Sequence, residues 1–502
     1  MSTEKTAVPA PRALALDALR GFAILTMILS GIIPRGTLPG WMYHAQTPPP
    51  THVFNAGIPG ITWVDLVFPF FLFAMGAAIP LAFTKRIRQG VSSLHMVLFI
   101  LKRGLMLGAF GIYLQHMRPY VMNPQPDTGT WLAAIGGFLL LFAVWGRFPA
   151  KWPSAIKYGI QAAGWIILIT VLSLWERPDG EAFSLYRSDI IIMILANVSV
   201  YGSLVWLFTR KSILMRLGCM GIIMAGVLAS QESGWVQYLW TLRTIPGLDP
   251  DNVPSFLSWL VRFDWLIMIG TLKYLFIIIP GTIAGDLLLS WMKTLKEESP
   301  LEALTWSRSR LWSITAVMTA LILLILIGLQ ARWITFTLIS TFVLAGLSLF
   351  LLRHPQSKAE FFLHRIIKWG LFWLILGLIF EPFEGGIKKD PVTTSYLLIN
   401  SGLAIFFMAS FTIIIDIFRK KWFTLFITNG QNPMVAYVGW GNLVQPIINL
   451  LGLVTILERI FTTLFSRFIT EPWVGVIQGI FYTLLVALAV HLITRLKIFL
   501  RS

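Results

Sequence analysis

The residues best suited to chemistry lie in one short stretch, where a histidine on a predicted loop precedes a carboxylate by thirteen positions. His52 is followed by Asp65, which opens a run that is otherwise apolar as far as Pro80. An ionisable group at the margin of hydrocarbon needs a partner, and we expect His52 to supply it. A neutral imidazole takes a proton from an attacking amine or hydroxyl, or carries an acyl group, and a neighbouring carboxylate fixes its tautomer. The pattern therefore predicts His52 and Asp65 as a catalytic pair.

Each member of this pair also has a simpler interpretation. Asp65 is a first-turn acid that the amides at the start of its own helix would bind, and His52 has the position of an exposed loop histidine. The other six histidines, His44 among them, show no metal-ligand spacing to a histidine, cysteine or carboxylate. The single cysteine, Cys219, lies in an apolar run. We therefore predict no metal site.

Three further polar residues are candidate substrate ligands. Asn55 lies on the same loop as His52, and Lys389 and Asn432 lie far along the chain. Lys389 and Asn432 are suited to polarise an acyl carbonyl or to bind substrate hydroxyls. The alternatives are an interfacial lysine beside Lys388 and an asparagine that bonds a neighbouring helix.

Arg20 and Arg103 are the candidate ligands for the phosphates of a donor of the coenzyme A type, because guanidinium groups bind phosphate with two parallel bonds. Asp17 precedes Arg20 by three residues, so an ion pair on one helix face is the alternative for Arg20. Gly281 and Gly285, four residues apart, leave room either for a ligand or for close approach of another helix.

Composition assigns these residues to a membrane protein. The chain of 502 residues is 56% hydrophobic and 13% charged, with a mean hydropathy of +0.74, which is more apolar surface than a soluble core can bury. Fourteen apolar runs are long enough to cross a bilayer. They lie near residues 14–33, 64–83, 97–115, 131–146, 158–175, 190–208, 213–230, 274–292, 311–329, 333–352, 366–380, 395–416, 431–451 and 474–494. Asp286, inside one of them, is expected to pair with Lys293 or with one of the charged residues above.

The basic residues set the orientation of these spans. If the spans alternate from an inner N-terminus, 28 of the 40 Lys and Arg residues fall on inner segments and 12 on outer ones. The net charge of +17 is therefore a membrane signal, and no nucleic-acid partner is expected. The prediction is an all-α polytopic transmembrane helix bundle of about 14 spans, one domain over 1–502, with both termini cytoplasmic. Residues 1–13 form an inner tail and residues 34–62 an outer loop with the candidate site.

Several blocks together resemble a known family. They are Leu16 through Met27, Gly60 through Gly76, Pro280 through Gly285, Lys389 through Tyr396 and Gly430 through Gly439. In this order they resemble a bacterial branch of the heparan-alpha-glucosaminide N-acetyltransferase family of transmembrane acyltransferases. The chain departs from that family by extra helical hairpins at 190–230 and 311–352, and by lacking the family's Gln-Arg motif at 131–146.

The resemblance implies transfer of an acetyl group from cytosolic acetyl-CoA to an amino sugar or other glycan acceptor on the far, periplasmic side of a bacterial inner membrane. It also implies that a loop histidine is essential, and His52 takes that role by position. The lipid bilayer is the other expected partner, and a second copy of the chain, in a homodimer, is a further candidate partner. The alternative is a transporter or flippase for a lipid-linked or small amphipathic solute, and a third hypothesis is a scaffold of a cell-envelope assembly.

Overall fold

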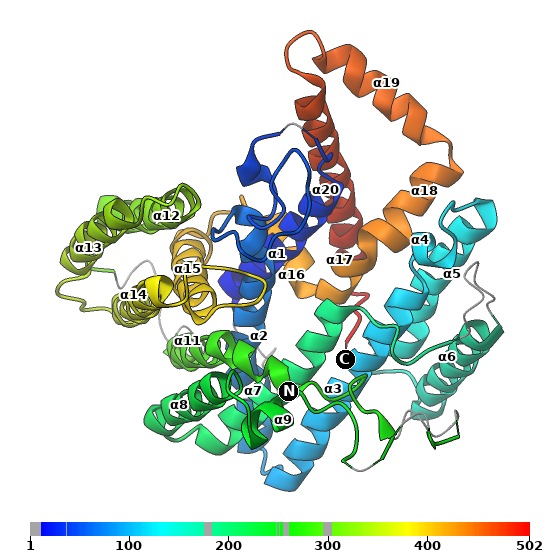
Figure 1. The fold of residues 1–502 in the computed structure, drawn as a ribbon, viewed down its shortest axis with the longest axis horizontal. Helices are drawn as coiled ribbons and strands as arrows, with labels where there is room; N and C mark the ends of the chain where they lie inside the picture. The colour runs from blue at the N-terminus through cyan, green and yellow to red at the C-terminus, as the bar shows by residue number, and fades with distance from the viewer. Residues whose placement is uncertain are drawn as a thin grey trace, which may run out of the picture.

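The apolar runs of the sequence fold into a bundle of helices (Figure 1). The computed structural model describes residues 12–36, 38–174, 183–246, 248–249, 252–254, 261–294 and 304–501, so the tail expected at 1–13 lies almost wholly outside the described residues. The long helices are α1 (Leu14–Ile32), α2 (Trp63–Arg88), α3 (Ser93–His116), α5 (Thr128–Trp145), α6 (Ser154–Leu174), α7 (Ile190–Thr209), α8 (Ile213–Ala229), α11 (Leu275–Thr294), α12 (Arg308–Gln330), α13 (Ile334–Leu351), α14 (Lys358–Phe383), α15 (Thr394–Phe411) and α20 (Glu471–Arg495). Shorter elements are η1 (Gly40–Met42), α4 (Pro119–Met122), α9 (Trp235–Trp240), η3 (Ile269–Tyr274), η4 (Thr412–Ile417), α16 (Thr424–Gln431), α17 (Pro433–Gly439), η5 (Trp440–Val444), α18 (Gln445–Leu450) and α19 (Leu453–Phe465).

Within the described residues, twelve helices are long and apolar enough to cross a membrane, and a thirteenth span is formed if the bent pair of α17–α18 and α19 counts as one. This makes the chain a multi-pass membrane protein and confirms the predicted all-α bundle. Among the described residues these candidates are fewer than the fourteen runs expected, because α8 has only 17 residues and the run expected at 431–451 qualifies only together with α19. At about 1.5 Å per residue α8 falls short of a hydrocarbon core about 30 Å thick.

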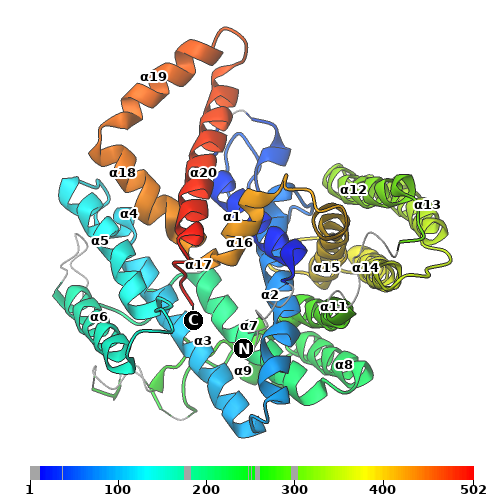
Figure 2. The same ribbon diagram turned by 180° about the vertical axis from the view of Figure 1, so that it is seen from behind.

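The long helices of the bundle begin and end on two opposite sides. We call the side of residues 38–62 and 384–393 the loop side, where Gly60 N–H donates to the carbonyl of Ile387 at 2.8 Å. We call the opposite side the basic side, where α2 and α20 end and where residues 496–501 lie. Successive long helices run between these two sides, as the ribbon views from front and back show (Figures 1 and 2).

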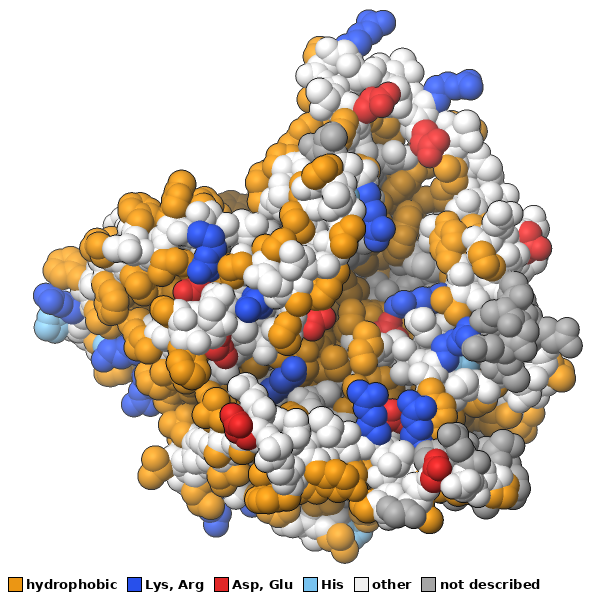
Figure 3. Space-filling model, in the orientation of Figure 1, with side chains coloured by type: hydrophobic (Ala, Val, Ile, Leu, Met, Phe, Trp, Pro, Cys, Tyr) orange, Lys and Arg blue, Asp and Glu red, His pale blue; other side chains and the backbone are white. Residues whose placement is uncertain are grey.

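The most deeply buried helix is α15, which packs against α14, α12, α11, α1 and α2. Of the most apolar 18 residues, 94% are buried in the span containing α15 but only 17% in α6. The apolar side chains exposed on peripheral helices match a lipid environment, and hydrophobic side chains cover much of the surface in Figure 3. The hairpins expected at 190–230 and 311–352 correspond to α7–α8 and α12–α13, and α7 packs directly against α3.

The ionisable residue inside α11 has a partner that the sequence did not predict. Asp286 accepts from Arg216 NH1 at 2.7 Å and from Trp206 Nε1 at 3.2 Å, so neither Lys293 nor Arg20 pairs with it. Arg216, on α8, is fully buried and also donates to Thr282 Oγ1 at 3.1 Å. This ion pair ties the short helix α8 to α11 and α7.

Candidate active site

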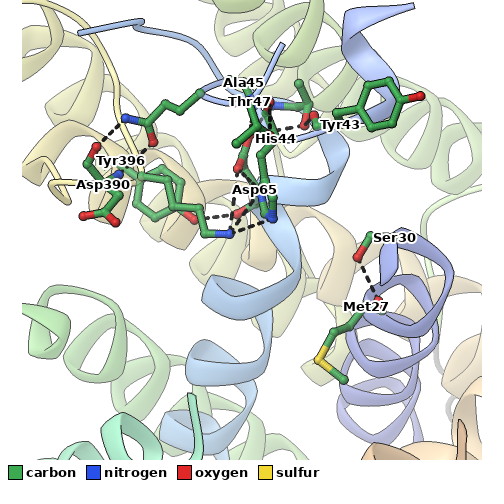
Figure 4. A network of polar contacts seen from close by, with 12 residues as sticks. Met27, Ser30, Tyr43, His44, Ala45, Thr47, Asp65, Asp390 and Tyr396 are labelled. Carbon is green, nitrogen blue, oxygen red and sulfur yellow. Dashed lines mark hydrogen bonds and ion pairs between the residues drawn. The ribbon is translucent and has the colours of Figure 1, made fainter. Parts of the chain in front are cut away.

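The residues with the clearest chemical arrangement are His44 and Asp65, on the loop side. Asp65 lies in the first turn of α2, and its Oδ1 is 2.7 Å from Nδ1 of His44, which follows η1 on the loop. Figure 4 shows the two side chains facing each other. The carboxylate is almost wholly buried, whereas 40% of the His44 side chain is exposed. A buried carboxylate on Nδ1 favours the tautomer with a proton on Nδ1 and a lone pair on Nε2.

The other oxygen of Asp65 caps its own helix. Oδ2 accepts from the backbone N–H of Thr62 at 3.0 Å and from that of Ala45 at 3.2 Å. Thr62 precedes the helix and Asp65 is its third residue, a spacing in which the acid reaches back to the first free amide. Asp65 is therefore the capping acid that the simpler interpretation expected, and it also pairs with a histidine, although that histidine is His44 and not His52.

Lys389, expected above as a substrate ligand, joins the cluster from a distant part of the chain. Its Nζ lies 3.1 Å from Nδ1 and 3.3 Å from Nε2 of His44, and 4.0 Å from Oδ1 of Asp65. Because these two distances are nearly equal, the amine lies beside the imidazole ring and is not aligned with the lone pair of one nitrogen. Burial lowers the pKa of Lys389, while the charges of Asp65 and Asp390 act in the opposite direction.

Two further contacts hold the loop of Lys389 in place. Gln46 binds the backbone of Asp390 twice, accepting from its N–H at 2.9 Å and donating to its carbonyl. Tyr396, in the first turn of α15, donates from its hydroxyl to the backbone carbonyl of Asp65 at 2.6 Å. Asp390 and Tyr396 flank the pair in Figure 4.

The expected pairing of His52 with Asp65 is wrong, because the loop folds back on itself at Pro48–Pro50. His52 N–H donates to the carbonyl of Pro48 at 3.1 Å, and its ring packs edge-on to Tyr43 with centroids 4.5 Å apart. Its Nε2 lies 3.2 Å from the backbone N of Gly36. The fold therefore directs His52 toward the start of the loop and brings His44 to the carboxylate.

The two asparagines proposed as substrate ligands have structural partners instead. Asn55 is exposed, and its Oδ1 accepts from Gly57 N–H at 2.8 Å within the same turn. Asn432 is fully buried at the break between α16 and α17, on the basic side, where its Nδ2 donates to the carbonyl of Ile498 at 2.8 Å. Neither side chain reaches the histidine on Asp65.

Arg20 and Arg103 do come together, at a cavity of about 610 Å³. Five arginines line it: Arg12, Arg20, Arg86, Arg103 and Arg501. The ion pair expected within α1 also forms, with Arg20 NH1 3.5 Å from Oδ1 of Asp17. In the region of α1 and α17, the surface in Figure 3 is hollowed, with acidic and basic side chains around the hollow.

The cavity runs along much of the bundle. Its α2 lining begins at Phe71 and ends at Arg86, a rise of about 22 Å at 1.5 Å per residue. Phe68 continues the same stripe of α2 one turn closer to Asp65, and its ring packs edge-on to Tyr274 with centroids 5.6 Å apart. The aromatic pair therefore lies between the loop-side end of the cavity and the start of α2, where the His44 cluster lies.

Gly281 and Gly285, expected to leave room for a donor, instead allow two helices to touch. A Cβ on Gly281 would lie 2.5 Å from the carbonyl oxygen of Phe73, and one on Gly285 would lie 2.3 Å from that of Ala77. The backbone of α2 fills the space beside both glycines. Their role is helix packing, which the sequence left open as the alternative.

Sequence reasoning missed His44, because residue types do not distinguish two histidines on one loop. The signal that separates them is the pair of contacts that closes the loop, from Asn55 N–H to the Gln46 carbonyl at 2.9 Å and from Gln46 to Asp390. These contacts fix residues 43–46 on the start of α2.

The helices and this polar cluster define a multi-pass membrane protein with a histidine–carboxylate–lysine site at one side of the bundle. Residues 12–288, slightly more than half of the chain, match the family described as a domain of unknown function (DUF5009). The chain belongs to this family. The match includes His44, Asp65 and four of the five cavity arginines, and it ends before Lys389. A comparison with curated proteins finds no match.

Proposed function

We propose that this protein is a membrane-embedded acyltransferase, which moves an acetyl or other acyl group from a coenzyme A donor to an amino sugar or glycan acceptor. The observation that carries the proposal is the contact between His44 Nδ1 and the buried carboxylate of Asp65, with the imidazole partly exposed. This arrangement leaves Nε2 as the reactive nitrogen. His44 takes the role that the sequence alone gave to His52.

Two routes use the same atoms. In the first, Nε2 attacks the thioester carbonyl carbon, the carbon–sulfur bond breaks, and coenzyme A leaves as the thiolate; the acceptor then displaces the imidazole. In the second, Nε2 removes the proton from the acceptor amine or hydroxyl as that group attacks the thioester carbonyl carbon directly; the carbon–sulfur bond breaks, and coenzyme A leaves as the thiolate, which takes the proton from Nε2. In both, Asp65 stabilises the positive imidazole, and Lys389 is suited to donate to the oxygen on which negative charge develops.

The arginine cavity is the proposed donor site. Arg20 and Arg103 are on its wall with three further arginines, and a coenzyme A molecule carries several phosphate charges that such a wall would bind. In this proposal the basic side faces the cytoplasm and the loop side faces the periplasm of a bacterial inner membrane. The acyl arm would pass along α2, and Phe68 and Tyr274 would have to move aside for it to reach His44.

The test is transfer of labelled acetyl from acetyl-CoA by the purified protein, with the label mapped to a peptide or to an added amino sugar. His44→Ala should abolish transfer, and the matched control His52→Ala, on the same loop, should retain it. Equal transfer by His44→Ala and the unaltered protein would refute the proposal. Loss of transfer in His52→Ala alone would return the catalytic role to that residue.

A second candidate function is transport, and the length of the cavity favours it. The cavity lining extends along α2 and α7, and neither His44 nor Lys389 is part of it. A passage for a lipid-linked or amphipathic solute would use this space without any acyl transfer. His44→Ala would then leave solute movement in proteoliposomes intact, and no label from acetyl-CoA would reach the protein or an acceptor.

A further inference from the structure

The basic-side end of the arginine cavity is bordered by a short segment that follows α20. Leu500 and Arg501 both line the cavity, and Leu500 is buried. This end of the cavity is therefore built by Leu500 and Arg501 as well as by the helices that form its walls.

The segment is tied down on both flanks. Asn432 donates to the carbonyl of Ile498 at 2.8 Å and accepts from the N–H of Leu500 at 3.3 Å. On the opposite flank, Arg501 N–H donates to the carbonyl of Trp145 at 2.8 Å, and the carbonyl of Phe499 accepts from Arg147 at 2.9 Å. Four hydrogen bonds over four residues give the segment one defined path. A fully buried asparagine that bonds only backbone here serves to position that path.

The charge at this end of the cavity is unbalanced. Asp17 pairs with Arg12 at 2.6 Å and with Arg20 at 3.5 Å. In the part of the chain that the structure describes, no carboxylate lies within 4.0 Å of Arg86, Arg103 or Arg501. Burial and the nearby charges of Arg147 and Arg12 lower the pKa of Arg501. Several cations held together without enough anions form a site for a polyanionic ligand.

We propose that residues 498–501 are a strap that carries Arg501 as a phosphate ligand of the donor site, and that Asn432 is the positioning residue that holds the strap. The inference rests on the proposed function, because it assigns a further residue to the donor site. The ligand chemistry is a nucleotide with several phosphate groups, since a planar guanidinium binds phosphate oxygens in pairs. A phospholipid headgroup at the membrane surface presents similar phosphate chemistry, so the experiment has to separate the two sources.

The experiment measures binding of coenzyme A, and separately of adenosine 3′,5′-bisphosphate, to the full chain in neutral detergent by calorimetry. Arg501→Gln should weaken both by about tenfold or more, because a charge-assisted hydrogen bond is lost. The matched control is Arg495→Gln, which removes an exposed arginine six residues earlier that does not line the cavity, and it should bind as the unaltered protein does. Asn432→Ala should show the same loss, and the double variant should lose no more than either single variant.

The outcomes separate this inference from the proposed reaction. If Arg501→Gln binds both nucleotides with unchanged affinity, or if Arg495→Gln loses as much affinity, the proposed role of the strap is wrong, even if acyl transfer is observed. A weakened Arg501→Gln in a protein that transfers no acyl group would support the strap and refute the reaction. If Arg501→Gln affects only binding to vesicles containing phosphatidylglycerol and not to either nucleotide, the ligand is a lipid headgroup and the proposal is wrong.

Discussion

At the scale of single residues, the arrangement around Asp65 shows how one carboxylate serves two purposes. Oδ2 caps the start of α2, and Oδ1 orients His44. Because the capping bonds hold the carboxylate in place, the imidazole is oriented before any substrate binds. Such preorganisation is what a histidine base or nucleophile requires.

The substitution Asp65→Asn tests whether this carboxylate supports the chemistry of His44. The amide retains the size of the side chain but cannot stabilise a positive imidazole, so we expect acyl transfer to fall by about 100-fold or more in single-turnover measurements. The matched control is Asp127→Asn, because Asp127 caps the start of α5 by accepting from Thr130 N–H at 2.8 Å and has no histidine partner. A similar loss of transfer in both variants would show that only capping matters.

The lowered pKa of Lys389 predicts how the stability of the folded protein depends on pH. Burial lowers its pKa in the folded state, while the unfolded chain retains a value of about 10.4. Between these two pKa values the unfolded state binds more protons, so the stability that the neutral amine contributes is complete above about pH 10.4 and is lost as the pH falls through the folded pKa. The melting temperature of the unaltered protein should therefore increase relative to that of Lys389→Met as the pH rises toward 10. A constant difference across that range would contradict the partial burial of the amine, whose side chain is 32% exposed.

Residue types and the family resemblance together pointed to two residues of this cluster. Asp65 and Lys389 follow from the cost of charged groups beside hydrocarbon and from the family resemblance, and the structure brings them together. His44 does not follow, because its position depends on how the Pro-rich loop turns at Pro48–Pro50, and the hydrogen bonds that decide the turn join residues up to about 340 positions apart. Asn432, expected to bind the substrate, instead bonds the backbone of Ile498, a partner 66 positions further along the chain.

At the scale of the helices, the regions of the spans were predictable from hydrophobic runs, since each predicted run corresponds to helical structure. Their packing was not, because contacts between helices depend on small residues whose partners are far away in the sequence. The junction of α2 and α11 is an example, where Gly76, Gly281 and Gly285 let the two backbones meet.

This junction predicts a clear effect of a single methyl group. Gly281→Ala would place a Cβ 2.5 Å from the Phe73 carbonyl and should lower the free energy of unfolding by about 1–3 kcal/mol through overpacking. The matched control is Gly221→Ala on α8, where a Cβ meets no atom within 4 Å, and it should be neutral or slightly stabilising. Thermal unfolding in detergent measures both. Equal stability of the two variants would refute the close approach of α2 and α11.

The ion pair between α8 and α11 gives a second prediction at this scale. Asp286→Ala leaves the guanidinium of Arg216, 1% exposed, without its carboxylate and should cost about 3–5 kcal/mol of stability. Asp264→Ala, which breaks the more exposed pair with Arg262 at 2.9 Å, should cost less than about 1 kcal/mol. Comparable losses in the two variants would contradict the burial of Arg216.

At the scale of the whole molecule, α2 connects the two chemical features. Its first turn carries Asp65 beside His44, on the loop side, and its last turn carries Arg86 in the arginine cavity, on the basic side. A donor held by its phosphates at one side and a histidine at the other would divide the reaction between the two faces of a membrane. The proposed reaction therefore requires that acyl groups supplied at the basic side reach His44.

The most direct measurement uses proteoliposomes in which acetyl-CoA with a labelled acetyl group is supplied on one side only, in protein whose orientation has been determined. We expect label at the peptide containing His44, or on an amino sugar at the loop side, only when acetyl-CoA is on the basic side, and none in His44→Ala. Label that appears equally from either side, or that persists in His44→Ala, would contradict the proposed reaction.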